Sequence, residues 1–440
     1  MMAISPDQNN LTQYNLKRPL GVALIGLGTV GIGVYKLLAN HPHITIKGIV
    51  VKDPAKPRDV VPHCPVQTDP FFWENDPDVD LVIEVIGGTT LSKTIIEKAL
   101  VRGKHVVTAN KALLAEFGPT LFATAQENNV QILFEGAVAG GIPILLPLKQ
   151  SLAANHIQAI AGIVNGTTNY ILTKMTQEGL GYAQALKQAQ ELGFAEADPS
   201  SDVEGLDARA KIALLASLAY QKTIDLEQIH CQGISTITAL DIQEAEALGY
   251  VIKLIGWVAK PTSTDDSLDI RVHPMLVPKS HPLAAIHNEF NAVWVKGDAV
   301  GDVTFSGRGA GELPTASAVC GDVLSILADW QVGNQILPVM AMHLTGPAQM
   351  IPITETTNKY YLRLETSDLP GVIGNLGKAC GEFGVSLESV LQRNTHKDGS
   401  ATIVLVTHQV QEKQMKQALQ RMASQETTKE VACLLRVLSS

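Results

Sequence analysis

The feature that most constrains the fold is a glycine-rich run, G-L-G-T-V-G at residues 26–31, directly after the apolar stretch L-G-V-A-L-I that begins at residue 20. A helical stretch continues to residue 38, and a second apolar run, I-T-I-K-G-I-V-V-K, begins at residue 44. A strand, a glycine loop, a helix and a second strand in this order make a βαβ unit, which requires a parallel sheet. The chain therefore starts with a predicted Rossmann-type domain of the α/β class.

The three glycines of this loop have different expected roles. Gly26 would make the tight turn, Gly28 would let the backbone approach a pyrophosphate, and Gly31 would let helix and strand pack closely. Thr29 and Val30 open the helix, whose amide groups favour phosphate. An ordinary turn is the alternative, but the position between a strand and a helix predicts nucleotide binding.

The end of the second strand bears on which nucleotide is bound. Residues 50–53 read V-V-K-D, so Lys52 stands where an NAD-selective site usually carries an acidic residue, and Lys56 and Arg58 follow. Basic side chains suit the 2′-phosphate of NADP(H), which we expect as the cofactor. NAD is the alternative, because Asp53 is close enough to hold a ribose and the cations also fit a solvated loop.

Apolar runs at 80–86, 105–108 and 131–134, separated by helical stretches, continue the first domain. We assign residues 19–147 to this dinucleotide-binding domain and expect residues 307–332 to complete it. Residues 1–18 are polar and are expected to form a disordered leader.

Two further units follow the first domain. Residues 148–335 predict an α+β substrate and dimerisation domain, with helices at 181–192, 203–220 and 242–257 and strands at 157–164 and 269–277. Residues 336–357 are rich in Pro and Thr, as in a linker. Residues 358–440 alternate as strand, helix, strand, strand, helix and strand, which is a ferredoxin-like βαββαβ order.

Composition restricts the function classes. Lys and Arg number 34 against 43 Asp and Glu, a formal charge of -9 without a basic run, so nucleic acid is not an expected partner. The five cysteines form no C-x-x-C pair, which argues against a zinc knuckle or a disulfide framework and favours a reducing cytoplasm. No run reaches the ~18 apolar residues of a membrane span, so no membrane association is expected.

A carboxylate-rich segment at 189–211 carries the candidate chemistry. It reads A-Q-E-L-G-F-A-E-A-D-P-S-S-D-V-E-G-L-D-A-R-A-K and leads into a helix. Asp207 and Lys211 are four residues apart and share one helix face. Such a pair is usually a surface ion pair, so the spacing alone does not identify a site.

The spacing of this segment resembles the signature of homoserine dehydrogenases. The matching positions are Ala189, Gly193, Asp198, Pro199, Asp202, Gly205, Asp207 and Lys211. The resemblance continues through T-A-N-K at 108–111, E-G-A-V-A-G-G-I-P at 135–143, N-G-T-T-N-Y at 165–170 and G-R-G-A-G-E-L-P-T at 307–315. It covers essentially the whole chain after the leader. It implies NAD(P)-dependent interconversion of L-aspartate 4-semialdehyde and L-homoserine, in the biosynthesis of threonine, methionine and isoleucine.

The resemblance also implies roles for individual residues. Lys211 looks like the proton donor and acceptor, Lys111 like a second catalytic lysine, and Asp207 and Glu196 like substrate ligands, with Asp207 also part of the catalytic group. An ammonium near the carbonyl oxygen suits this reaction, because hydride addition builds negative charge there. The positions expected beside the cofactor, apart from the loop and Lys52 and Arg58, are Lys111, Gly193 and Gly311.

A glycine-rich crossover at 135–143 is the candidate metal site. The family resemblance implies a sodium ion or a similar monovalent cation, held by Glu135 and by the backbone oxygens of Val138, Gly140 and Ile142. Carbonyl and carboxylate oxygens are suitable ligands for a hard cation. A simple domain-crossover turn is the alternative.

The last unit resembles an ACT domain. Its turn from Asp368 to Gly371 precedes a helix, which is where such domains hold small amino acids at a dimer interface. In this family the effector is commonly threonine, so threonine feedback is expected, and a purely dimerising unit is the alternative. The expected assembly is a homodimer or a homotetramer.

Other functions fit parts of the chain. Another amino-acid dehydrogenase is one alternative, and a semialdehyde dehydrogenase would need a nucleophilic cysteine in an activating setting, which none of the five has. A non-catalytic nucleotide and amino-acid sensor would be expected to lack Lys211 or Asp207, and both are present. Residues 165–169 fit either a substrate pocket or an N-capped turn.

Overall fold

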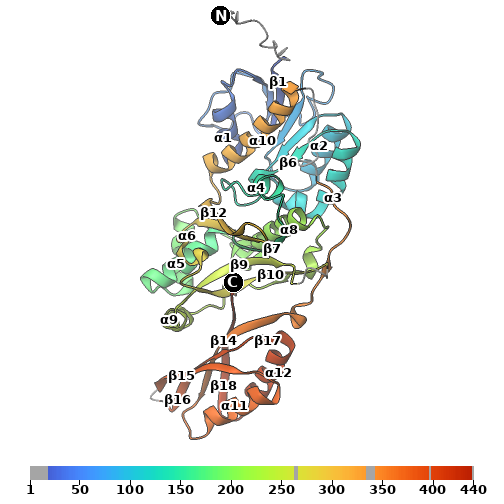
Figure 1. Ribbon diagram of the computed structural model, residues 1–440. Helices are drawn as coiled ribbons and strands as arrows, with labels where there is room; N and C mark the ends of the chain where they lie inside the picture. Colours follow the sequence, from blue (N-terminus) through green and yellow to red (C-terminus); the bar gives the residue numbers. More distant parts are fainter. Residues whose placement is uncertain (1–17, 262–265, 333–341, 396–397, 439–440) are drawn as a thin grey trace, which may run out of the picture.

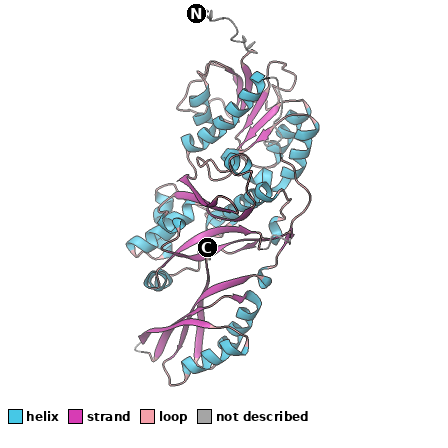
Figure 2. Cartoon of the chain, viewed as in Figure 1, coloured by secondary structure: helices cyan, strands magenta, loops and turns pink. Residues whose placement is uncertain are grey.

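The computed structural model describes residues 18–261, 266–332, 342–395 and 398–438 (Figure 1). The leader expected at 1–18 lies outside these residues except for Arg18, and so do positions 336–341 of the expected linker. The chain forms three consecutive units, with the first sheet near one end and the last unit at the other (Figures 1 and 2).

The first unit is a six-stranded parallel sheet. Its strand order is β3 (Val66–Gln67), β2 (Ile44–Val50), β1 (Leu20–Ile25), β4 (Leu81–Glu84), β5 (His105–Thr108) and β6 (Ile132–Leu133). Helices α1 (Thr29–Leu38), α2 (Thr90–Val101) and α3 (Lys111–Glu127) connect the strands. This order confirms the Rossmann prediction, and it places the expected ligand crevice at the carboxyl ends of β1 and β4.

Helix α10 (Glu312–Val332) comes from late in the chain and packs against α1 (Figure 1). A Cβ on Gly33 of α1 would lie 2.7 Å from the Cβ of Ala316 and 2.7 Å from the carbonyl oxygen of Glu312. The two helices therefore approach each other at a distance that a side chain at Gly33 would prevent.

The second unit is a sheet covered by helices on one face. Its strands run in the order β12 (Gly301–Arg308), β11 (Phe290–Gly297), β7 (Ile157–Ile163), β9 (Tyr250–Ala259) and β10 (Ser267–Pro278), and the short β8 (His230–Cys231) also pairs with β10. Its helices are α4 (Leu145–Lys149), α5 (Gly166–Glu178), α6 (Tyr182–Glu191), α7 (Ser200–Val203), α8 (Leu206–Tyr220) and α9 (Ala239–Ala247).

The helix predicted at 242–257 is wrong in its second half. Helix α9 ends at Ala247, Gly249 adopts a φ of +84°, and β9 follows. Val251, Ile252 and Ile255 favour a strand because they are β-branched, and β9 gains partners on both sides from β7 and β10. The apolar run was long enough to fit a helix, and pairing with distant strands decided the outcome.

The last unit has the predicted βαββαβ order. It contains β14 (Thr357–Ser367), α11 (Val372–Glu382), β15 (Leu387–Thr395), β16 (Ser400–Thr407), the short β17 (Val410–Gln411), α12 (Glu412–Ala423) and β18 (Thr428–Val437). Its sheet order is β18-β14-β16-β15, and both helices lie on one face (Figure 1).

The second and third units share one continuous sheet. The end of β18 pairs in parallel with β10, with Met275 opposite Arg436 and Leu276 opposite Val437. The described part of the connecting segment also follows the second unit, because β13 (Gln349–Met350) pairs with β10. The last unit is therefore attached along a strand edge as well as through its connection.

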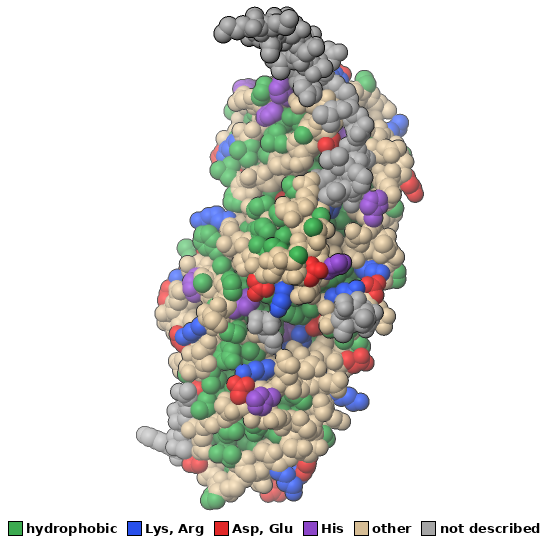
Figure 3. Space-filling view, viewed as in Figure 1, with side chains coloured by type: hydrophobic (Ala, Val, Ile, Leu, Met, Phe, Trp, Pro, Cys, Tyr) green, Lys and Arg blue, Asp and Glu red, His purple; other side chains and the backbone are tan. Residues whose placement is uncertain are grey.

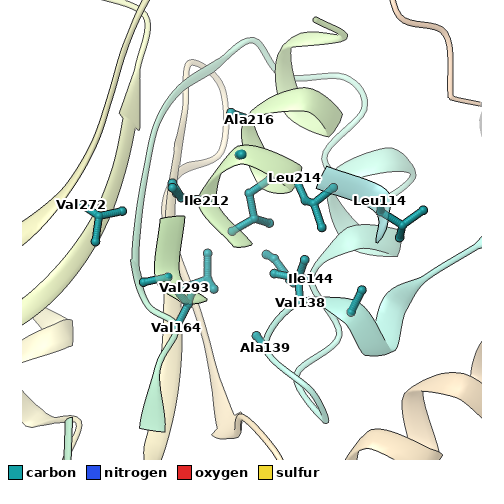
Figure 4. Close-up of a cluster of buried hydrophobic side chains, with 14 of the residues drawn as sticks. Leu114, Val138, Ala139, Ile144, Val164, Ile212, Leu214, Ala216, Val272 and Val293 are labelled. Atoms are coloured by element: carbon teal, nitrogen blue, oxygen red, sulfur yellow. The ribbon is translucent and has the colours of Figure 1, made fainter. Parts of the chain in front are cut away.

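A hydrophobic cluster joins the first two units (Figure 4). Val138, Ala139 and Ile144 from the glycine-rich crossover face Ile212 and Leu214 of α8 in this view. All five are buried, so the crossover fixes α8 against the first domain.

On the face drawn in Figure 3, acidic and basic side chains are interspersed. Among the described residues, no helix has both the length and the apolar character needed to cross a membrane.

Candidate active site

The glycine loop connects β1 to α1 at the carboxyl edge of the first sheet. Gly26 has a φ of +112°, and a Cβ on Gly31 would lie 2.1 Å from the carbonyl oxygen of Gly26. A Cβ on Gly28 would meet no atom within 4 Å. The loop is therefore closed toward the sheet and open on the side of Gly28, where a ligand can approach the backbone.

A cavity of about 1000 Å³ opens beside this loop. It is lined by the loop residues Ile25 to Thr29, the segment Val50 to Asp53, Lys56 to Asp59, the residues Val85 to Gly87, and Glu312, among others. This volume is at the upper end of the ~300–1,000 Å³ of ligand sites. Val30 is not part of the lining and packs against the core of the domain.

Three charged residues of the loop after β2 face the cavity in different ways. The Arg58 guanidinium donates to the carbonyl oxygens of Leu27, Lys56 and Asp53, at 3.3, 2.8 and 2.9 Å. The Asp53 carboxylate accepts from the amide of Ala55 at 2.9 Å, so it is used in a local turn. Lys52 is exposed and lines the cavity. Arg58 thus holds the loop, whereas Lys52 is available to a ligand.

Asp207 bridges two lysines that come from different units. Its Oδ2 lies 2.7 Å from Nζ of Lys211, one helical turn along α8, and its Oδ1 lies 3.0 Å from Nζ of Lys111, the first residue of α3. The Asp207 and Lys211 side chains are 9% and 12% exposed, whereas Lys111 is 39% exposed. The structure therefore brings the three residues expected to be catalytic into one cluster.

The electrostatics of the cluster favour an ionised carboxylate. Burial alone would raise the pKa of Asp207, but the charges of Lys211 and Lys111 and a hydrogen bond from Asn165 hold it well below its usual range. Asp207 also lies in the first turn of α8, where the helix dipole favours negative charge.

Two further residues complete the cluster. Asn165 caps α5, accepting from the amide of Thr168 at 2.9 Å, and its Nδ2 donates to Asp202 Oδ1 at 2.7 Å and to Asp207 Oδ2 at 2.9 Å. Burial raises the pKa of Asp202, opposed by the hydrogen bond from Asn165. The structure confirms the N-cap interpretation for Asn165, which also contacts Asp202 and Asp207; the substrate-pocket interpretation of residues 165–169 stays a prediction.

Lys211 is fixed by a second contact. Its Nζ donates to the carbonyl oxygen of Val164, just after β7, at 2.7 Å. An ammonium group has three donors, and two are used by Val164 and Asp207. One N–H of Lys211 is left without a partner among the described residues. No sequence signal pointed to Val164, because its contact is made by a backbone oxygen.

The other expected substrate and cofactor residues are more exposed. Glu196 and Gly193 are both exposed and lie in the segment between α6 and α7, and Gly193 has a φ of +77°. Gly311 directly precedes α10 with a φ of +131°. Its neighbour Glu312 lines the nucleotide cavity and forms an ion pair with Lys36 at 2.7 Å. Gly193 and Gly311 are not among the residues that line this cavity.

The glycine-rich crossover is closely packed. The Glu135 carboxylate accepts from the amides of Ile144, Leu145 and Leu146 at 2.6 to 2.8 Å, so it caps the start of α4. A Cβ on Gly140 would lie 2.2 Å from the carbonyl oxygen of Gly309, which makes a side chain impossible there. These contacts give the glycines and the carboxylate structural roles. No cluster of three or more His, Cys, Asp or Glu side chains suited to a metal occurs in the described part of the chain.

The turn expected to hold an effector borders a separate cavity of about 360 Å³. Asp368 and Gly371 both line it, and Gly371 adopts a φ of +92° as it starts α11. Asp368 accepts from Nε2 of Gln392 at 3.1 Å.

Three segments match known families. Residues 143–324 match the homoserine dehydrogenase family, residues 26–135 match the NAD-binding domain of homoserine dehydrogenase, and residues 360–427 match the ACT domain.

Homoserine dehydrogenases of other organisms match nearly the whole chain. A homoserine dehydrogenase of Synechocystis sp. is 44% identical over 95% of this chain and 99% of its own length. That of Bacillus subtilis is 43% identical over 96% of this chain and 98% of its own length.

Solved structures give the same result. The crystal structure of a homoserine dehydrogenase from Thiobacillus denitrificans superposes with a TM-score of 0.90 at 35% identity, covering 96% of this chain and 98% of that one. A hyperthermophilic archaeal homoserine dehydrogenase in complex with NADPH superposes with a TM-score of 0.59 at 26% identity, over 70% of this chain and 97% of that one. The chain belongs to the homoserine dehydrogenase family and is an NAD(P)-dependent oxidoreductase acting on a CH–OH group, with a C-terminal ACT domain.

Proposed function

We propose that Lys211 transfers the proton when L-aspartate 4-semialdehyde is reduced to L-homoserine, with Asp207 and Lys111 holding the charge around it. The observation that carries this proposal is the Asp207 carboxylate, which contacts Nζ of Lys211 at 2.7 Å and Nζ of Lys111 at 3.0 Å. The bound nicotinamide supplies the hydride. The aldehyde carbon accepts the hydride, its oxygen takes a proton from the ammonium, and the reverse reaction returns both.

The two lysines have different suitability for this step. Lys211 is nearly buried and is held by Val164 and Asp207, so its remaining N–H has a defined direction. Lys111 is more exposed and suits a stabilising charge beside the developing oxyanion. Glu196 supplies a carboxylate for the ammonium group of the substrate.

The assay is the rate of nucleotide oxidation by purified protein with L-aspartate 4-semialdehyde, and of nucleotide reduction with L-homoserine. L-Serine, which is one methylene shorter, is the matched control substrate. Turnover with homoserine and not serine supports the proposed substrate. Faster turnover with serine would reassign the enzyme to another amino-acid alcohol.

NADP(H) is the proposed nucleotide. Lys52 lines the cavity and is exposed, while Asp53, which could hold a ribose, is used by the amide of Ala55. A 2′-phosphate beside Lys52 would gain a charge-assisted contact that NAD cannot make. The ratio of kcat/KM for NADPH over NADH tests this preference.

A monovalent cation is proposed at the crossover. Among the described residues, the carbonyl oxygens of Val138, Gly140 and Ile142 accept no hydrogen bond, and such oxygens suit a hard cation. Glu135 would act mainly through its negative charge, since three amides already occupy its oxygens. Thermal unfolding in sodium and in choline chloride at equal ionic strength tests the site, and equal midpoints would contradict it.

Feedback by threonine at the ACT turn is proposed for this enzyme, together with a dimeric or tetrameric assembly. Such feedback fits an enzyme in the biosynthesis of threonine, methionine and isoleucine. The Asp368 carboxylate and the α11 start at Gly371 border a cavity of about 360 Å³. Inhibition by threonine should weaken in Asp368→Asn while the uninhibited rate is unchanged. Full inhibition in this variant would place the effector elsewhere. The molar mass in solution, measured by light scattering, tests the proposed dimer or tetramer.

A further inference from the structure

A second small cavity lies where the ACT unit joins the substrate unit. It measures about 350 Å³. The wall residues come from β9, β10, the segment before β14, and the end of β18, and they include Trp257, Asp269, Arg271, Met275, Thr356 and Val437. None of these residues belongs to the Asp207 cluster or to the Asp368 turn. This volume is near the lower end of the ~300–1,000 Å³ of small-molecule sites.

The wall of this junction cavity holds a buried pair of opposite charges. Arg271 and Asp269 are 4% and 8% exposed, and Nη2 of Arg271 lies 3.1 Å from Oδ2 of Asp269. The same Oδ2 accepts from Nε1 of Trp257 at 3.1 Å, and Nη1 of Arg271 donates to the Thr356 hydroxyl at 3.3 Å. Burying such a pair costs free energy unless further contacts satisfy its remaining donors and acceptors.

Both charges have unused hydrogen-bonding capacity. Arg271 has five N–H donors, and its Nε is buried without a partner among the described residues. Asp269 Oδ1 likewise accepts no hydrogen bond from the described residues. Burial raises the pKa of Asp269 even beside Arg271, so a further cation here would stabilise the ionised carboxylate.

We propose that this junction cavity binds the zwitterion of a free α-amino acid with an apolar side chain. The ligand carboxylate pairs with Arg271, its ammonium pairs with Oδ1 of Asp269, and its side chain lies against Met275, Ile351 and Val437. A zwitterion offers an opposite charge to each member of the pair, whereas a ligand with a single charge can do so for only one of them. Because β10 and β18 both contribute, an occupant contacts the substrate and ACT units together.

Equilibrium binding of four probes to the full-length protein tests this site: L-valine, L-leucine, L-isoleucine and L-methionine at millimolar concentration. Isoamylamine and 4-methylpentanoate, which keep the leucine side chain but lack the carboxylate or the ammonium, are the matched controls. We expect saturable binding of at least one amino acid and none of either control. Failure of all four to bind would overturn the proposal.

Three variants locate the binding. Asp269→Asn removes the carboxylate charge, and Ala259→Leu, directly opposite Asp269 on the neighbouring strand, fills the cavity while keeping both charged side chains; each should weaken binding about tenfold or more. Asp368→Asn, at the ACT turn, should leave it unchanged. Unchanged binding in both cavity variants, or loss only in Asp368→Asn, would overturn the site. Unaltered turnover in the Ala259→Leu variant confirms that its fold is intact.

Discussion

The Asp207 cluster and the ACT junction both bury a carboxylate beside cations, but they use different cations. At Asp207 the partners are two lysines, one of them 39% exposed. At the junction, Arg363 of β14 forks onto Asp241 of α9, with Nε to Oδ1 at 2.8 Å, and the two side chains are 7% and 0% exposed. Arg436 of β18 holds Glu412 of α12 in the same way.

This difference follows from the chemistry of the two side chains. Lysine is a point charge with three rotatable donors, so it can hold a carboxylate and still offer a proton. Arginine is planar, stays charged and satisfies both carboxylate oxygens at once. The proton transfer proposed for Lys211 therefore suits a lysine, whereas each arginine pair holds two elements in one geometry.

Lys211→Ala should give the largest effect. Turnover should fall by about 10²–10⁴-fold, because proton transfer to the substrate oxygen is lost. NADPH affinity, measured by nucleotide fluorescence, should be unchanged. The control is Lys187→Ala, which breaks an exposed pair with Glu191 at the same helical spacing. Near-normal turnover in the Lys211 variant would remove this lysine from the mechanism.

Arg363→Met should act on stability and leave catalysis intact. Asp241 would remain buried without its cation, which costs about 3–5 kcal/mol, reduced by the hydrogen bonds from Thr238 to the same carboxylate. Thermal unfolding should begin at a lower temperature, with unchanged kcat at low temperature. The control Arg421→Met breaks an exposed pair with Glu382 and should cost less than ~1 kcal/mol. Equal midpoints for the two variants would contradict the structural role of the junction pair.

The features that could be predicted from sequence are the local ones. The loop at 26–31 and the four-residue spacing of Asp207 and Lys211 each depend on neighbouring residues, and the structure has both as expected. The chain order of the ACT unit could be predicted for the same reason, because each of its elements has its own periodicity.

Contacts between distant segments could not be predicted in this way. Family resemblance alone implied that Lys111 belongs to the same site as Asp207, their ion pair was not predicted, and Asp202 and Val164 had no assigned role. The pairing of β10 with β18 joins segments that are far apart in the sequence. The strand at Tyr250–Ala259 likewise depends on pairing with strands from other parts of the chain. Strands β11 and β12 were missed, although they deliver the segment that leads into α10. Tertiary pairing decides such features.

Lys52→Glu should change nucleotide choice by a moderate factor. Reversing this charge should weaken NADPH by about tenfold or more and NADH much less, since NADPH alone carries the 2′-phosphate. Lys52 is preferable to Arg58 for this test, because Arg58 also holds the loop through three carbonyl oxygens. Lys93→Glu on α2, a half-buried lysine that pairs with Glu97 and does not line the cavity, controls for net charge. Equal weakening of both nucleotides would show a general electrostatic effect.

Glu196→Gln should give the smallest effect and sharpens the contrast between exposed and buried charges. Glu196 is exposed, and among the described residues its carboxylate has no ion pair, so its contribution arises only when a cationic amino group is bound. An exposed charge contact contributes up to ~1 kcal/mol, which corresponds to a KM for homoserine raised by about two- to fivefold. The backbone oxygen of Glu196 accepts from Gln190 at 3.1 Å, a contact that glutamine preserves. Glu191→Gln, on the exposed end of α6, is the matched control. A lower kcat at unchanged KM would mean that Glu196 acts in the transition state, whereas unchanged kinetics would place it on the surface alone.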